Sequence, residues 1–210
     1  MEFRDLVEKR ASVRQFRADP VDPQDLREMV RLAILAPSPN NSQPWQFVAV
    51  TRRSTLGDMA AAVRQRLDAL LPVAASDEAR RARQRVEWSS TFFEDAPAVI
   101  AVALTPYEAV VQRVLGESVD GASQINALRG QPDVESVGAA IEHLLLAATD
   151  LGYGACWLSG PVVAREALER MLGIAPPNRL AAMVAVGRPV EAPGHRLERR
   201  SVEELLRFID

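Results

Sequence analysis

Apolar residues recur along the chain with two spacings, which divide it into helical and strand segments. Helical spacing predicts helices at residues 2–10, 22–36, 55–71, 76–90, 136–151, 164–173 and 202–209. Short apolar runs rich in β-branched residues predict strands at residues 46–51, 97–104, 155–158 and 180–186. Two helices precede the first strand, so simple alternation of strand and helix does not describe the N-terminus. The pattern predicts an α+β chain with four or five strands.

Several helix ends carry local stop and start signals. Asp22 is placed as an N-cap with Pro23 in the first helical position, and Ser201 with Glu204 forms a capping box. Gly152 follows the helix at residues 136–151, which is apolar almost all round. Such a helix is expected to be buried on several sides, in a core or in a subunit interface.

Within residues 106–133 the helical pattern is broken by Gly116, Gly121, Gly130 and Pro132. We interpret this stretch either as a mobile excursion over a site or as an ordinary surface insertion. The rest contains neither an internal repeat nor a linker long enough to split the chain, so residues 1–210 are expected to form a single domain.

Composition narrows the classes of function. The 210 residues are 48% hydrophobic and 25% charged, with a net charge of −3, which is typical of a globular protein and not of a nucleic-acid or membrane surface. The charged N-terminus lacks the apolar region of a secretory signal, so cytoplasm is the expected location. Cys156 is the single cysteine, and the two histidines, His143 and His195, lie far apart, so we expect neither a disulfide nor a metal site.

Two polar stretches are candidates for ligand binding. Ala36–Trp45 holds three prolines among two asparagines, two serines and a glutamine, so its polar groups would be held rigidly against a flat ligand. The alternative is a connector whose side chains satisfy their own backbone. In an extended segment Arg10, Ser12 and Arg14 share one face, which suits a phosphate, although a solvated charged edge strand would show the same alternation.

These two stretches, together with Leu151–Gly160 and Val186–Pro189 followed by a basic tail, resemble the nitroreductase family of FMN-dependent oxidoreductases. The resemblance covers nearly the whole chain outside residues 72–95 and 106–133. It implies a three-layer α-β-α fold around a mixed, mainly antiparallel sheet. It also implies an intertwined homodimer with two FMN molecules at the interface, each touched by both subunits.

The resemblance also assigns roles to individual positions. The phosphate and the pyrimidine edge of the flavin would be held by the first motif: Arg10, Ala11, Ser12 and Arg14. The flavin of the other subunit would be reached by the proline-rich loop: Pro37, Ser38, Pro39, Asn41 and Gln43. Backbone N–H groups of Ser159 and Gly160 would approach the N5 and O4 edge, and Arg199 or Arg200 would contact the phosphate. The chain departs from the family at two of these positions, because the family often has a basic residue in place of Ala11 and a serine in place of Pro39. The family also has a polar residue on the helix after the first strand, and Gln65 is the candidate for it here.

The activity implied is transfer of a hydride from NADH or NADPH through flavin N5 to a nitroaromatic, a quinone or another small electron acceptor, in a ping-pong order. The flavin carries this chemistry, so no catalytic side chain and no metal is expected. Alternatives within the family are an enone reductase, a dehalogenase and a flavin-cleaving enzyme. A further alternative is a protein that binds FMN without turnover.

Overall fold

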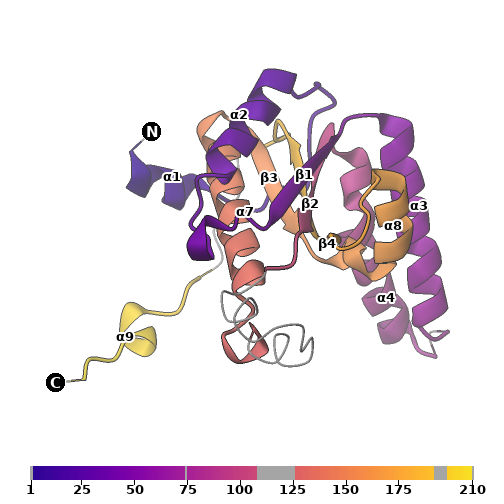
Figure 1. Cartoon of the computed structure of the whole chain (residues 1–210). Helices are drawn as coiled ribbons and strands as arrows, with labels where there is room; N and C mark the ends of the chain where they lie inside the picture. Colours follow the sequence, from indigo (N-terminus) through magenta and orange to yellow (C-terminus); the bar gives the residue numbers. More distant parts are fainter. Residues whose placement is uncertain (1, 74, 108–125, 192–197, 210) are drawn as a thin grey trace.

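The structure is a computed structural model that describes residues 2–73, 75–107, 126–191 and 198–209. A four-stranded sheet lies at its centre in the order β1-β2-β4-β3 (Figure 1). The strands are β1 (Trp45–Val50), β2 (Ala98–Leu104), β3 (Gly154–Leu158) and β4 (Arg179–Gly187). The three pairings between these strands are antiparallel, and Ser12 adds an isolated parallel bridge to Ala155. The predicted mixed, mainly antiparallel sheet is therefore confirmed.

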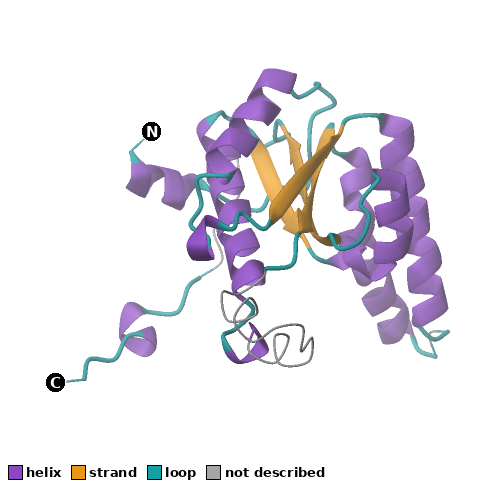
Figure 2. Cartoon of the chain, in the orientation of Figure 1, coloured by secondary structure: helices purple, strands orange, loops and turns teal. Residues whose placement is uncertain are grey.

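Helices cover both faces of the sheet, which gives the predicted three layers (Figure 2). One face carries α2 (Pro23–Ala33) and α7 (Pro132–Asp150), with α1 (Phe3–Lys9) against α7. The other face carries α3 (Arg53–Leu70), α4 (Asp77–Thr91) and α8 (Arg165–Leu172). The described chain contains no helix that is both long and apolar enough to cross a membrane.

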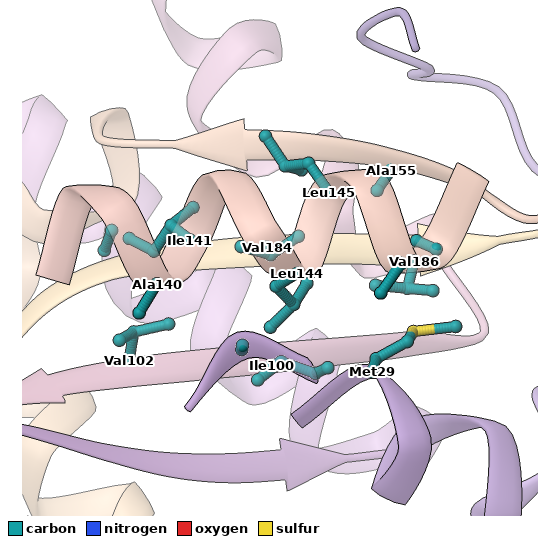
Figure 3. Packing of buried hydrophobic residues seen from close by; sticks show 14 of the residues in the cluster. Met29, Ile100, Val102, Ala140, Ile141, Leu144, Leu145, Ala155, Val184 and Val186 are labelled. Atoms are coloured by element: carbon teal, nitrogen blue, oxygen red, sulfur yellow. The ribbon is translucent and has the colours of Figure 1, made fainter. Parts of the chain in front are cut away.

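Alternate residues of β2 belong to two separate hydrophobic cores, because successive side chains of a strand point to opposite faces of the sheet. Ile100 and Val102 pack with Leu144 of α7 and Val184 of β4 (Figure 3). Their neighbours in β2 belong to the cluster that α3 and α8 complete on the other face. All seven residues of β2 are buried, as the continuous apolar run predicts. Burying each of its valine, isoleucine and leucine side chains stabilises the fold by about 1.5–3 kcal/mol.

The predicted caps are present, but several helix boundaries differ from expectation, and α2 ends at Ala33 instead of residue 36. Asp22 Oδ1 accepts from the Gln24 N–H at 2.8 Å, and Ser201 Oγ accepts from the Glu204 N–H at 3.2 Å. Helix α7 begins at Pro132, four residues before the predicted start, because a proline is well tolerated in the first helical turn.

The prediction of a helix at residues 202–209 is wrong in length, since α9 spans only Val202–Leu205. Residues 198–209 are exposed throughout, and so short a helix is marginal without packing against the body. Within the stretch at 106–133, residues 108–125 lie outside the described part of the chain, so its interpretation as an excursion stays a prediction.

Tyr153 ties α2 to the turn between α7 and β3. Its hydroxyl donates to Asp25 Oδ2 at 2.7 Å, and the guanidinium carbon of Arg188 lies 4.4 Å from its ring centroid. Arg188 Nη1 also donates to the Gly152 carbonyl at 3.2 Å. Burial, and then the bond to Asp25, raises the pKa of the Tyr153 hydroxyl above its ordinary value of 10.0. The proton therefore binds more tightly in the folded chain than in the unfolded one.

Replacing Tyr153→Phe should lower the free energy of unfolding by about 1 kcal/mol at neutral pH, because one hydrogen bond to a carboxylate is lost. Thermal unfolding should show a melting temperature about 2–4 °C lower. The difference from wild type should persist up to the ordinary tyrosine pKa and shrink as the pH rises through the raised folded value. A difference that grows at alkaline pH would contradict this account.

Candidate functional site

An extended segment, residues 10–16, runs along the outer edge of β3. The Val13 N–H donates to the Ala155 carbonyl at 3.0 Å, and Phe16 forms a second bridge to Pro189. Val13 is buried, whereas Ser12 and Arg14 on either side of it are exposed. The predicted alternation is therefore present, and the polar face of the segment is open to a ligand.

Gly154 allows this segment to approach β3. A Cβ atom at position 154 would lie 2.6 Å from Val13 Cγ2 and 2.7 Å from Val13 Cβ, which is closer than real Cβ contacts. Any larger residue would push Val13 away, and Ser12 and Arg14 would move with it. The glycine thus fixes the position of the polar face relative to the sheet.

The polar face carries two guanidinium groups at different exposures. Arg10 is only 18% exposed, and its Nε lies 3.5 Å from Glu142 Oε1 on α7. Arg14 is exposed, and its Nη1 donates to the Ser12 carbonyl at 3.4 Å. Two guanidinium groups and the Ser12 hydroxyl on one edge suit an anion with several oxygen atoms, such as a phosphate monoester. We call Arg10, Ser12 and Arg14 the basic edge.

Cys156 lies in β3 beneath the basic edge. Burial raises the pKa of its thiol, although Arg14 and Ser12 oppose that shift. The residue is 3% exposed, and a thiol whose pKa is raised above its ordinary value stays protonated at neutral pH. Cys156 therefore acts as a packing residue and not as a nucleophile.

Ser159 and Gly160 form the turn that follows β3, on the same edge of the sheet as the basic edge. A Cβ atom at position 160 would lie 2.6 Å from Ser90 Oγ, so the last turn of α4 packs directly against Gly160. Two residues earlier on α4, Trp88 is 54% exposed, with its ring centroid 5.6 Å from that of Phe92. The sequence did not predict that α4 lies beside the Ser159–Gly160 turn, because the resemblance does not extend over residues 72–95.

The proline-rich loop, residues 36–45, is held by its prolines, as predicted, and also by hydrogen bonds that the sequence did not reveal. Asn40, Asn41 and Gln43 have φ values of 52°, 54° and 46°, a left-handed region that favours glycine. Ser38 Oγ accepts from the Gln43 N–H at 3.0 Å, so this hydroxyl satisfies the loop's own backbone. Asn40 Nδ2 donates to the Tyr107 hydroxyl at 2.8 Å. The side chains of Asn41 and Gln43 remain exposed.

Strained backbone of this kind persists where the surroundings hold it, and it is common at ligand sites. The other two predicted loop positions differ in exposure, since Pro37 is exposed and Pro39 is half-buried in the short turn η1 (Pro39–Asn41). The loop leads into Pro44 and Trp45, which are buried and anchor it to β1.

The structure does not bring all the predicted site residues together within one chain. The loop precedes β1, and the basic edge lies on β3, so they occupy opposite edges of the sheet. Three inter-strand spacings separate those edges, a distance of about 14 Å. Arg199 and Arg200 lie on the exposed C-terminal segment, which projects from the body in Figure 1, and Arg200 Nε pairs with Glu204 Oε2 at 3.0 Å.

Two other predicted positions have different surroundings. Ala11 is half-buried between Arg10 and Ser12, where its methyl group adds no donor to the basic edge. Gln65 lines an open groove of about 530 Å³ between α3 and α8, together with Asp58 and Met171. This groove lies in the helical layer on the face of the sheet opposite α7. None of these assignments is tested by the single chain, and they stay predictions.

The fold and the basic edge define an α+β protein with two arginines and a serine along one edge of its sheet. The family model named Nitroreductase family matches residues 7–188, so the chain belongs to the nitroreductase family. This match includes the basic edge, the proline-rich loop and the Ser159–Gly160 turn. It ends before Arg199 and Arg200.

Individual relatives agree with that membership. The chain is 33% identical to 5,6-dimethylbenzimidazole synthase of Rhodospirillum rubrum, over 94% of this chain and 89% of the relative. It is also similar to the crystal structure of a BluB-like flavoprotein from Clostridium difficile, with a TM-score of 0.87, 30% identity and full coverage of both chains. A nitroreductase with bound FMN from Desulfitobacterium hafniense shares the fold, with a TM-score of 0.72, 19% identity and coverage of 98% and 97%.

Replacing Gly154→Ala should lower the free energy of unfolding by about 1–3 kcal/mol, because the new methyl group overpacks against Val13. Gly57→Ala is the matched control, since a Cβ atom at that helical position would meet nothing within 4 Å. The control should be stabilised by up to about 1 kcal/mol. Urea unfolding of both variants measures the contrast, and equal midpoints would show that Val13 is not held against Gly154.

Proposed function

We propose that the chain is an FMN-dependent oxidoreductase that transfers a hydride from NADH or NADPH to a small acceptor such as a nitroaromatic or a quinone. The observation that carries this proposal is the basic edge, where a fixed extended segment presents two guanidinium groups and a hydroxyl beside β3. Membership of the nitroreductase family supports an oxidoreductase, and FMN is present in the Desulfitobacterium relative.

The donor set fits FMN. The phosphate of FMN is a monoester, with up to two negative charges at neutral pH, and arginine forks bind such groups through paired N–H donors. Arg10 and Ser12 would hold this phosphate, and Arg14 would lie at the pyrimidine edge, where a cation stabilises negative charge. When bound, FMN supplies the ability to accept a hydride from one substrate and to donate it to another.

A homodimer completes the proposed cleft. Because the loop and the basic edge lie on opposite edges of one sheet, the loop of a second chain would lie at the basic edge of the first. Asn41 and Gln43 would then face a flavin held by the partner, with their positions fixed by the loop's hydrogen bonds. Exposed apolar side chains of the C-terminal segment also suit coverage by a second chain: Val202, Leu205, Leu206, Phe208 and Ile209.

A second candidate function is favoured by a specific similarity. The relative from Rhodospirillum rubrum is a 5,6-dimethylbenzimidazole synthase, and it is matched at higher identity than the FMN-bound nitroreductase. Its product contains the same dimethyl-substituted benzene ring as a flavin. In this alternative, reduced FMN would be consumed as a substrate, and the basic edge would hold that substrate by its phosphate.

An absorbance spectrum of the purified protein, followed by anaerobic titration with NADH and with NADPH, tests the proposal. We expect bound flavin that is bleached by at least one nucleotide, and continuous nucleotide oxidation when menadione is added. A single stoichiometric reduction without turnover would indicate a binding protein. Release of 5,6-dimethylbenzimidazole from reduced FMN in air would favour the second candidate. A colourless protein that neither binds FMN nor oxidises nucleotide would exclude all three.

Replacing Asn41→Ala should weaken FMN binding about three- to tenfold while the dimer stays intact, because one hydrogen-bonding side chain of the loop is lost. Ser42→Ala is the control, since this neighbouring side chain is also exposed and is not assigned to the flavin. Flavin retained after gel filtration, together with the elution volume, measures both effects. Equal flavin retention by the two variants would remove Asn41 from the site.

A further inference from the structure

The guanidinium of Arg10 contacts the carboxylate of Glu142, a residue that lies outside the sequence motifs assigned to the flavin. Arg10 directly follows α1, and its N–H donates to the Leu6 carbonyl at 3.0 Å, so its backbone is fixed. Its Nε lies 3.5 Å from Glu142 Oε1, and the arginine side chain is only 18% exposed. The contact uses Nε, and no described residue accepts a hydrogen bond from the two terminal Nη groups, which are therefore available to a ligand.

Glu142 lies on a helix that is packed firmly into the core. It lies on α7, where the neighbouring Ile141 and Leu144 are completely buried. Gly138, one turn earlier on the same face, lies beside Trp157 of β3, whose ring is 3.7 Å from a Cβ atom built at position 138. Glu142 therefore lies on the side of α7 that borders the β3 edge.

We propose that Glu142 is a positioning residue that orients Arg10 towards the phosphate of FMN. This inference rests on the proposed function and names a residue that decides how tightly the same site binds its phosphate. An arginine loses a large rotamer entropy when a ligand immobilises it. Contact with a carboxylate on a buried helix removes part of that freedom before FMN arrives.

The charge of Glu142 also repels a phosphate, and this effect opposes the gain from orientation. Glu142 is 48% exposed, so water and salt screen its field over the distance to a ligand on the far side of the Arg10 fork. The orientation of Arg10, in contrast, depends on direct contact. We therefore expect the loss of orientation to dominate when the carboxylate is removed.

The test compares dissociation constants for FMN and for riboflavin, which lacks the phosphate, by quenching of flavin fluorescence. Glu142→Ala should weaken FMN binding about three- to tenfold and leave riboflavin binding unchanged. Glu142→Gln keeps an oxygen acceptor for Arg10 and should stay within about twofold of wild type. Glu28→Ala is the control, because it removes a comparable glutamate–arginine pair, with Arg31, from α2. It should change neither constant.

A double-mutant cycle completes the test. In an Arg10→Gln background, Glu142→Ala should have no further effect on FMN binding, since its influence passes through Arg10. The inference is overturned if Glu142→Ala leaves FMN affinity unchanged or raises it, or if FMN and riboflavin affinities fall equally. If wild type binds neither flavin, the proposed function fails and this inference fails with it, whereas wild-type FMN binding without an effect of Glu142→Ala overturns this inference alone.

Discussion

The contact between Val13 and Gly154 is the constraint on which the candidate site depends. It lets an extended segment lie against the edge of β3, with Ser12 bridged to Ala155 and the Val13 N–H bonded to the same residue. The polar side chains on the other face of that segment then have fixed positions relative to the sheet. Without this close approach, Arg10 and Arg14 would be ordinary solvated arginines, which gain little from any single exposed ion pair.

The strand order determines how the rest of the site can be assembled. The proline-rich loop is rigid because its own hydrogen bonds and Tyr107 hold a backbone with positive φ values. The rigid loop does not lie beside the basic edge of the same chain, since it enters the sheet at the opposite edge. A cleft shared between two chains reconciles the two observations, and it is the arrangement that the proposed function requires.

Much of the fold could be predicted from the sequence, because the informative signals are local. The continuous apolar run of β2 and the Asp22 cap depend only on neighbouring residues, and both are present. The extent of α9 could not be predicted, because a periodic pattern does not reveal whether a partner surface exists. For the site, the alternation around Ser12 was visible, but the contacts of Arg10 with Glu142 and of Gly160 with Ser90 join residues far apart in the chain. Such contacts follow from topology and not from spacing.

The central claim is that two chains together build each flavin cleft. Sedimentation equilibrium of the protein with FMN, followed by the visible absorbance of the flavin, tests it most directly. The account predicts that bound flavin sediments with a species of twice the 23.0 kDa chain mass, with one FMN for each chain. Flavin that sediments tightly bound to a species of single-chain mass would contradict it.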